Sequence, residues 1–224
     1  MQVPGGLTAG FFVPAAAAAA GQLWSWGRGN YGALGLGNVT NYSSPKQVGA
    51  LTTWSKTMVG GLFSGVIKTD GTLWTWGYGQ SGKLGLGNVT NYSSPKQVGA
   101  LTTWSTGSLG PQHSSGVTTG GALWVWGENS GGRLGLGNTT DYSSPKQVGA
   151  LTNWDETSLG FYHSAAIKTD GTLWTWGYGV SGGLGLGNVT NYSSPKQVGA
   201  LTTWSKIASM RKACVAVKTD GTLW

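Results

Sequence analysis

The chain has 224 residues, of which only 9% are charged. It contains 41 glycines and 13 tryptophans, a composition that favours a turn-rich β protein. Its solubility must then depend on Ser, Thr and Asn rather than on charged side chains. Fourteen basic residues against seven acidic ones give a net charge of +7, which favours anionic partners without distinguishing nucleic acid, acidic glycan or membrane surface. The single cysteine, Cys214, excludes an intrachain disulfide. Cysteine content therefore does not indicate whether the protein is found in an oxidising or a reducing compartment.

The first twenty residues differ from the rest of the chain. Residues 1–20 end in an apolar, alanine-rich run that is too short to span a bilayer. This segment contains no Lys or Arg, so it lacks the basic region that begins a secretory signal. We therefore expect an N-terminal tail or linker at 1–20 and no membrane span.

From residue 21 onward one fifty-residue unit recurs. Leu-Trp pairs stand at fifty-residue intervals from Leu23-Trp24 to Leu223-Trp224, and residues 34–55 return unchanged at 84–105 and at 184–205. The units lie near 21–70, 71–120, 121–170 and 171–220, and together they count as one structural domain, 21–224. Such fidelity disfavours a single asymmetric active site made from unique residues.

Each unit predicts four short strands, as the fourth unit illustrates. Residues 165–169 and 172–176 form a hairpin around the turn pair Asp170-Gly171. A glycine-rich loop then leads to an outer strand at 193–198, where Pro195 suits a sheet edge because it has no amide hydrogen to donate. Residues 204–208 provide a fourth segment. Four short strands per fifty residues without a helical period predict a blade of a β-propeller.

The same residues resemble the repeat of the regulator of chromosome condensation (RCC1) family. The resemblance rests on Gly160 to Ser164, on the turn Asp170-Gly171, on the strand end Leu173 to Gly177, and on Leu184-Gly185 with Pro195 and Val198 beyond. It covers nearly all of 21–224 and implies an all-β propeller whose blades present variable loops to a partner protein. Nucleotide exchange is one specialised use that the resemblance implies.

The number of units leaves the architecture open. Propellers of this family carry about seven blades, whereas four units are present here. The first and last half-units could complete one shared blade and close a four-bladed ring. The chain also stops inside a strand, which favours a fragment or open arc of a larger propeller. An open arc exposes edge strands, so self-association would follow.

Several motifs look chemical but have structural explanations. Residues 27–32, 77–82 and 177–182 match the G-x-G-x-x-G spelling of a dinucleotide site, yet no sequence that could form a helix follows them, so we expect tight loops and no cofactor. His113 and His163 stand fifty residues apart, where the other units have Phe63 and Ala213, which favours packing over metal binding or catalysis. The acidic residues form no convincing pair, so we expect no catalytic or metal residues and no enzyme.

Other repeated residues are also expected to be structural. Cys214 replaces a serine of the earlier units, which favours a small packed residue over a reactive thiol. The paired tryptophans Trp174 and Trp176, and their equivalents, are expected in the core between blades rather than in a stacking site. Asn-x-Ser/Thr sequences such as Asn38 to Thr40 are interpreted as polar turns.

One lysine per unit is the clearest candidate for a binding surface. The segment Tyr-Ser-Ser-Pro-Lys-Gln-Val places a lysine and a tyrosine at the outer strand of every blade, which predicts a partner-binding rim of Lys46, Lys96, Lys146, Lys196, Tyr42, Tyr92, Tyr142 and Tyr192. Protection of an exposed strand edge explains the lysines equally simply, and we favour that explanation. Arg28, Lys83 and Arg133 mark a variable loop where partner specificity is expected.

These observations favour a non-catalytic protein-interaction or structural module. Its partner would be another protein or an anionic surface polymer, and the low charge and near-identical repeats suit a surface or virion adhesin. A guanine-nucleotide exchange factor for a small GTPase is an alternative that rests on the family resemblance alone, and no inserted hairpin supports it. A repetitive carbohydrate-binding lectin is a third hypothesis, which requires solvent-facing aromatic residues.

Overall fold

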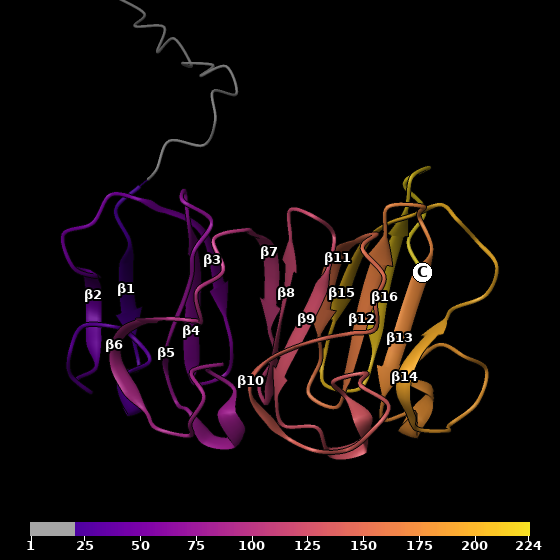
Figure 1. Cartoon of the computed structure of the whole chain (residues 1–224), viewed down its shortest axis with the longest axis horizontal. Helices are drawn as coiled ribbons and strands as arrows, with labels where there is room; N and C mark the ends of the chain where they lie inside the picture. The colour runs from indigo at the N-terminus through magenta and orange to yellow at the C-terminus, as the bar shows by residue number, and fades with distance from the viewer. Residues whose placement is uncertain (1–20) are drawn as a thin grey trace, which may run out of the picture.

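A computed structural model of the chain describes residues 21–224, so the tail expected at 1–20 lies outside the described residues. The described part is built almost entirely of antiparallel sheets that stand side by side along a curved row (Figure 1). No helix within it is long and apolar enough to cross a membrane.

Three four-stranded sheets form the middle of the row. We call them the first blade (β3–β6), the second blade (β7–β10) and the third blade (β11–β14). Their strands are β3 Trp54–Val59, β4 Phe63–Lys68, β5 Leu73–Gly77, β6 Tyr92–Gln97, β7 Trp104–Leu109, β8 His113–Thr118, β9 Leu123–Gly127, β10 Tyr142–Gln147, β11 Trp154–Leu159, β12 His163–Lys168, β13 Leu173–Gly177 and β14 Tyr192–Gln197. Each blade thus begins at the fourth segment of one sequence unit and continues into the next unit.

A two-stranded sheet lies at each end of the row. The N-terminal half-blade consists of β1 (Trp24–Gly27) and β2 (Tyr42–Gln47), which correspond to the third and outer strands of a complete blade. The C-terminal half-blade consists of β15 (Trp204–Ser209) and β16 (Cys214–Lys218), which correspond to the first two strands. Each half-blade therefore contains the strands that the other one lacks.

The two half-blades do not meet, so the four-bladed closed ring considered from the sequence is wrong. They stand at opposite ends of the row (Figure 1), and β1 pairs with β2 whereas β16 pairs with β15. Among the described residues no pairing joins β1 to β16. The described residues form an open arc.

Local chemistry explains the hairpin within each blade. In the third blade Gly171 takes a φ of 76°, which an L-residue rarely adopts. The carboxylate of Asp170 accepts hydrogen bonds from the backbone N–H and the hydroxyl of Thr172, at 3.0 and 2.6 Å. The turn thereby fixes the pairing of β12 with β13, in which Ala166 lies opposite Trp174. The hairpin predicted from the sequence is confirmed.

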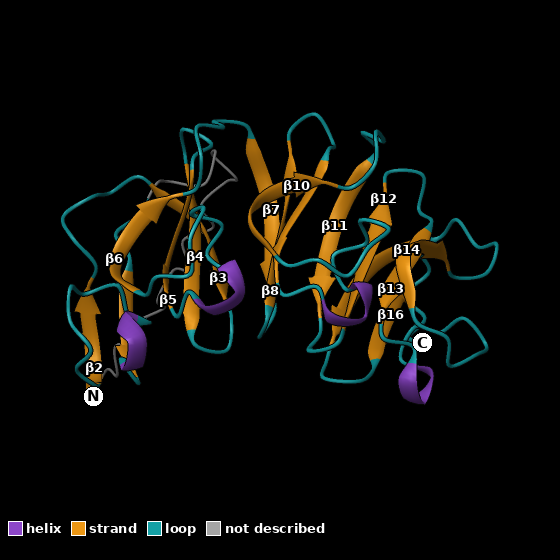
Figure 2. Cartoon of the chain, turned by 60° about the horizontal axis from the view of Figure 1, so that its bottom comes forward, coloured by secondary structure: helices purple, strands orange, loops and turns teal. Residues whose placement is uncertain are grey.

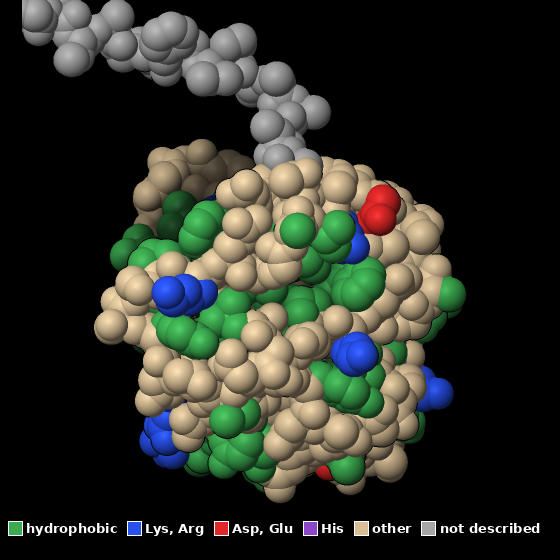
Figure 3. Space-filling view, turned by 90° about the vertical axis from the view of Figure 1, so that its left-hand side faces the viewer, with side chains coloured by type: hydrophobic (Ala, Val, Ile, Leu, Met, Phe, Trp, Pro, Cys, Tyr) green, Lys and Arg blue, Asp and Glu red, His purple; other side chains and the backbone are tan. Residues whose placement is uncertain are grey.

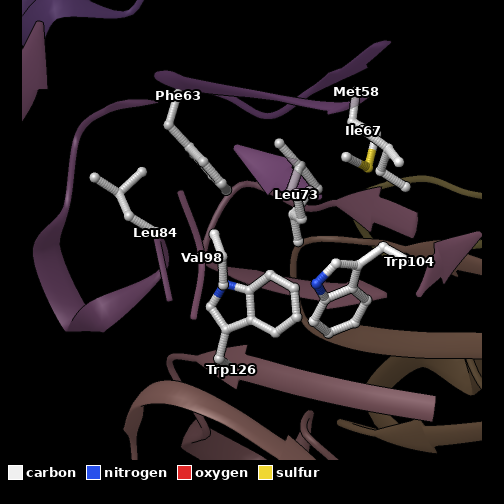
Figure 4. Close-up of a cluster of buried hydrophobic side chains, with 9 residues drawn as sticks. Met58, Phe63, Ile67, Leu73, Leu84, Val98, Trp104 and Trp126 are labelled. Carbon is white, nitrogen blue, oxygen red and sulfur yellow. The ribbon is translucent and has the colours of Figure 1, made fainter. Parts of the chain in front are cut away.

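The hydrophobic core lies between blades. Trp126 of β9 is fully buried in a cluster with Phe63, Leu73, Leu84 and Val98 of the first blade (Figure 4). Its indole N–H donates to the carbonyl of Lys83, 2.9 Å away. Trp76 and Trp176 occupy the same position one blade before and one blade after. The core role predicted for the paired tryptophans is confirmed for the second member in the three complete blades. The first member is only half-buried there, and Trp24 and Trp26 are both exposed.

Candidate interaction surface

The lysine rim predicted from the sequence lies on the outer strands β2, β6, β10 and β14. All four lysines are exposed and all four tyrosines are half-buried. Each ammonium group lies 5.4–5.6 Å from the ring centroid of the tyrosine on its own strand. Neither of the two salt bridges formed by residues 21–224 involves these lysines. The rim is thus a row of equivalent cation–aromatic pairs, one for each outer strand.

The tyrosines of the rim are already engaged within their own blades. Each phenol oxygen accepts a hydrogen bond from the asparagine four residues earlier, as Tyr92 does from the amide of Asn88 at 3.2 Å. The ammonium group of the lysine on the same strand also lies over each tyrosine ring, so little of the ring surface is free to stack on a ligand. The rim offers charge more readily than aromatic surface.

The expected variable loop is only partly a surface feature. Arg28 is exposed, but Lys83 and Arg133 are only 3% and 2% exposed. The fifty-residue spacing also corrects their equivalence, since Arg28 corresponds to Tyr78, whereas Lys83 and Arg133 correspond to Ala33 and Gly183. Two of the three residues predicted to mark an open loop are therefore buried between blades.

Lys83 and Arg133 join each blade to the next. The ammonium group of Lys83 donates to the carbonyl of Pro111 and to the side chain of Gln112, both at 3.0 Å. Arg133 donates to the carbonyl of Phe161 at 2.9 Å and pairs with Glu128 at 3.4 Å. Burial lowers the pKa of both side chains, and these partners offset part of the cost of removing the charges from water.

The histidines lie in the same inter-blade layer. His113 Nε2 is 2.7 Å from Ser164 Oγ, and that hydroxyl donates to the carbonyl of Arg133. Ser164 can then only accept, so the hydrogen of His113 lies on Nε2. His163 repeats the contact with Cys214, whose sulfur is 3.0 Å away. The packing role predicted for both histidines is confirmed by their burial, and residues 21–224 hold no cluster of His, Cys, Asp or Glu able to bind a metal.

Two groups of loops come together at one end of every blade, and we call this surface the loop face. One group contains the short 3₁₀ turns η1 (Asn30–Gly32), η2 (Gln80–Gly82), η3 (Ser130–Gly132) and η4 (Val180–Gly182), which lie along the lower edge in Figure 1 and come forward in Figure 2. The other group is the turns between the first two strands of each blade. They are joined by backbone hydrogen bonds, such as that from Tyr178 N to the carbonyl of Tyr162 at 3.1 Å.

Differences between the four units are concentrated on this face. Position 28 and its equivalents are Arg, Tyr, Glu and Tyr, and position 30 and its equivalents are Asn, Gln, Ser and Val. Position 62 and its equivalents are Leu, Gln, Tyr and Lys. By contrast, residues 40–52, which include the outer strand, differ among units only at Asp141. Variation therefore follows the loop face and, beside it, the inner strands, while the outer strands stay nearly constant.

The loop face carries aromatic and cationic side chains. Tyr31 and Tyr78 lie 4.4 Å apart between ring centroids, and Phe161 and Tyr162 lie 4.6 Å apart. The guanidinium of Arg211 stands over the last two rings, 5.4 and 5.9 Å from their centroids. A cavity of about 250 Å³ opens beside them, lined by Tyr162, His163, Tyr178, Val180, Gly183 and Lys212. The sequence contains the signal for this surface, which is the position of the differences within each unit.

Comparisons with known proteins agree with the fold. The family model described as "Regulator of chromosome condensation (RCC1) repeat" matches residues 20–67, 70–117, 120–167 and 170–217, and a second model of the same description matches 155–182. No curated protein matches the sequence.

Solved structures with the same fold are longer than this chain. Human WBSCR16 aligns with a TM-score of 0.79 and 22% identity over 89% of this chain and 54% of its own. Prp20p from Saccharomyces cerevisiae aligns with a TM-score of 0.76 and 19% identity over 88% of this chain and 51% of its own. Yeast RCC1 (Prp20) bound to Kap60 aligns at 0.75 and 17% identity, over 100% and 59%. The chain thus spans between half and three fifths of the length of these structures.

Proposed function

Because the chain belongs to the regulator of chromosome condensation repeat family, we propose that it is a non-catalytic interaction module that holds a partner protein on its loop face. The observation that carries the proposal is the contrast between two exposed surfaces of nearly identical units. The outer strands recur almost unchanged, whereas the loop face carries a different set of side chains in every unit. A surface that contacts one asymmetric partner needs such differences between units.

The side chains of the loop face suit a protein partner. Tyrosine and arginine are enriched among the residues that contribute most to the affinity of protein interfaces. Tyr31, Val180 and Met210 are exposed there, and Arg211 lies over the pair Phe161 and Tyr162. Such a pair can contact a partner in two ways, because the guanidinium can bind a carboxylate and the aromatic ring can pack against an apolar side chain.

The structural neighbours support a protein as partner. One of them is described by its binding to Gsp1p and histones, and another is bound to Kap60. Those partners belong to those proteins, and for this chain we propose only the class of partner. The setting on a virion or cell surface stays a prediction from composition.

A photo-crosslinking experiment tests the loop face directly. Val180 on η4 and Val189 on the constant loop before β14 are both exposed, at 54% and 67%. Each is replaced in turn by a photoreactive amino acid, and the chain is irradiated in an extract of the source cells. We expect Val180 to capture a defined protein and Val189 to capture none. Equal capture from both positions, or from neither, would remove the proposal.

The lysine rim is the competing surface, and it is tested separately. Lys46, Lys96, Lys146 and Lys196 are changed together to Gln, and binding to a sulfated polysaccharide and to the crosslinked protein is compared at low and moderate salt. On our proposal the protein still binds this variant. If only polysaccharide binding exists and the variant loses it, the chain is an anionic-polymer binder or lectin of the rim.

Guanine-nucleotide exchange is the second candidate function. Family membership favours it, because the neighbour Prp20p is described by its binding to Gsp1p. Release of a fluorescent guanine nucleotide from a panel of small GTPases measures it. No acceleration over the spontaneous rate would exclude this activity for the chain and leave the interaction module.

A further inference from the structure

A lysine and two tryptophans meet at the end of the blade that lies opposite the loop face. In the third blade, the ammonium group of Lys168 lies over the rings of Trp174 and Trp154, 3.9 and 4.8 Å from their centroids. The first blade repeats these contacts at 4.0 and 5.0 Å. Because the face of an indole ring attracts a cation, each of these tryptophan pairs binds a cation that the chain itself supplies.

A threonine and an aspartate accompany each of these pairs. The indole N–H of Trp174 donates to the hydroxyl of Thr172 at 2.8 Å, and this hydroxyl donates to the carboxylate of Asp170 at 2.6 Å. The first blade repeats the two hydrogen bonds at 2.9 and 2.6 Å. Burial lowers the pKa of Lys168, and the nearby carboxylate of Asp170 offsets part of this effect. The aspartate thus helps to keep the buried lysine charged.

The second blade has the two tryptophans without their three companions. Thr118, Gly120 and Ala122 stand where the first and third blades have lysine, aspartate and threonine. The rings of Trp104 and Trp124 nevertheless meet edge to face at 6.4 Å, close to the 6.2 and 6.1 Å of the other two pairs. The aromatic pair is therefore retained in a blade that has lost the cation.

No other residue takes the place of the missing companions. None of the contacts between a cation and an aromatic ring within residues 21–224 involves Trp104 or Trp124. The hydroxyl of Thr118 accepts a hydrogen bond from the N–H of Ala122 at 3.2 Å, which holds it at the turn. The indole nitrogen of Trp124 is buried and has no hydrogen-bond partner. Both the ring faces and this N–H thus lack the partners that they have in the neighbouring blades.

A groove between neighbouring blades leads to the tryptophans. Between the second and third blades it has a volume of about 370 Å³, and Trp154, Trp174 and Lys168 are among the twelve residues that line it. Only Lys168 changes type at the preceding junction, where its equivalent is Thr118. Figure 4 shows Trp104 at that junction, among buried side chains of the first blade. Because threonine is shorter than lysine and uncharged, this junction has the same aromatic walls with room for a cation.

We propose that Trp104 and Trp124 form a binding site for one cationic group, an ammonium or guanidinium carried by a partner molecule. The occupant follows from the chain itself, because the equivalent pairs on both sides hold a lysine ammonium. The bound cation lies over the two rings, and an acceptor beside it receives the indole N–H of Trp124. This site is separate from the loop face, so it does not depend on the protein partner proposed there.

The aromatic rings, rather than an acidic patch, determine what the site selects. Charged side chains are sparse on the side of the molecule seen in Figure 3, and the net charge of the chain is +7, so the surface does not attract cations in general. A quaternary ammonium leaves water more easily than a primary one and makes the same contact with the rings. The site is therefore expected to prefer methylated ammonium groups.

Titration of the full chain with tetramethylammonium chloride tests the proposal, with the indole N–H signals followed by NMR. The variant Trp124→Phe identifies the signal of Trp124. We expect this signal to shift with saturation. Sodium chloride at the same ionic strength, and neopentyl alcohol as an uncharged molecule of similar shape, are expected to shift it at least tenfold less.

Two substitutions move the site within the chain. Thr118→Lys restores the lysine of the neighbouring blades and is expected to abolish the saturable shift, whereas the matched control Thr118→Ser retains it. Lys168→Thr is expected to add a saturable shift at Trp174. Circular dichroism of each variant checks that its sheets are intact. No saturable shift in the unaltered chain, an equal shift with neopentyl alcohol, or an undiminished shift in Thr118→Lys would overturn the proposal, as would a folded Lys168→Thr chain in which Trp174 does not respond.

Peptides distinguish a basic side chain from a free small cation. Blocked tripeptides that carry trimethyllysine, lysine or the uncharged norleucine at the central position are titrated in the same way. Tighter binding of the trimethyllysine peptide than of tetramethylammonium assigns the site to a side chain, whose backbone carbonyls supply an acceptor for Trp124. Weaker binding assigns it to a free quaternary ammonium. A norleucine peptide that binds as tightly as the trimethyllysine peptide would show that the occupant is not a cation.

Discussion

His113 and His163 show how a residue that looks catalytic becomes a packing residue. Burial lowers the pKa of His163 to about 4 and holds the pKa of His113 well below its usual value. The Nδ1 atom of His113 has no hydrogen-bond partner, and buried Lys83 and Arg133 add to the cost of a positive charge on that ring. Both imidazoles are therefore neutral at pH 7 and serve as uncharged hydrogen-bonding groups between blades.

We predict that these histidines destabilise the fold in mild acid. A histidine whose pKa is lower in the folded chain binds its proton more readily when unfolded, so its contribution is complete above about pH 6.5 and is lost as the pH falls toward 4. For His163 the loss approaches about 3 kcal/mol over that interval. Urea unfolding at pH 7 and at pH 4.5 measures it.

Phe63 provides a matched control, because the first unit carries phenylalanine at this position. The double variant His113→Phe and His163→Phe is expected to lose most of the difference between the two pH values. Asp70 and Asp170, whose pKa values are lowered by their hydrogen bonds to threonine, contribute mainly below pH 4 and remain in both proteins. An unchanged pH dependence in the variant would contradict the prediction.

At single positions, the differences between units predict burial better than residue type does. Phe63 and Ala213 stand where the other units have histidine, and this exchange correctly indicates the packing of Phe63, His113 and His163, although Ala213 itself is exposed. Lys83 and Arg133 could not be placed in this way, because their equivalents Ala33 and Gly183 are small and fit any surroundings. Their burial depends on carbonyl groups of the next blade, which the sequence does not display.

Among the elements, the close approach of neighbouring blades explains why the last residue of a 3₁₀ turn is glycine at Gly32, Gly82 and Gly132. Gly132 and Gly182 have φ values of 80° and 73°, so an alanine is strained by a similar amount at either position. Only Gly132 also lies against the next blade, where Ser193 leaves no room for a Cβ. The two positions separate the cost of the backbone conformation from the cost of the interface.

We predict that Gly132→Ala destabilises the chain more than Gly182→Ala does. Both lose about 1–2 kcal/mol to backbone strain, and Gly132→Ala loses about 1–3 kcal/mol more because the overlap forces the second and third blades apart. Urea unfolding of both variants compares them. Equal losses would show that the close approach to Ser193 has no energetic weight.

Strand existence was easier to predict than strand limits. The outer strand expected at 193–198 lies at Tyr192–Gln197, because Tyr192 pairs with Gly177 and Val198 turns inward after the strand ends. Val198 N then donates to the carbonyl of Leu173 at 2.8 Å. The 3₁₀ turns were expected only as tight loops, since Tyr31, Ser81 and Ser181 take positive φ values that local sequence does not favour.

For the whole molecule, the row of blades predicts unequal protection along the chain. Stability in a repeat array is a sum over units and the interfaces between neighbours, so a unit at the end lacks one interface. Strand β12 lies inside a complete blade, whereas its equivalent β16 is paired fully on one side only. The end of the row is therefore expected to open more often than its middle.

We predict faster hydrogen exchange in β16 than in β12. The sequences of these two strands differ, so their peptides are distinguishable by mass. Amides of Cys214–Lys218 are expected to exchange at least tenfold faster than those of His163–Lys168. Equal protection of both strands would show that the array opens as one unit.

The sequence did not predict whether the blades form a closed ring or an open arc. Composition and turn chemistry predict the blade, but the angle between blades depends on how Trp176 enters the cluster around Leu134 and on how close Gly132 comes to Ser193. These contacts are three-dimensional and repeat identically whether or not the row closes.

The identical outer strands carry one more consequence, for the way the chain finds its fold. The sequence of β2, β6, β10 and β14 is the same six residues, so no chemistry tells an outer strand which of four partners to choose. Only the short tether through the 3₁₀ turn restricts each one to the strand just before it. The length of the connection therefore determines which strand each outer strand pairs with. A long flexible insertion in that connection would allow an outer strand to pair in the wrong blade while forming the same kinds of contact as in the native one.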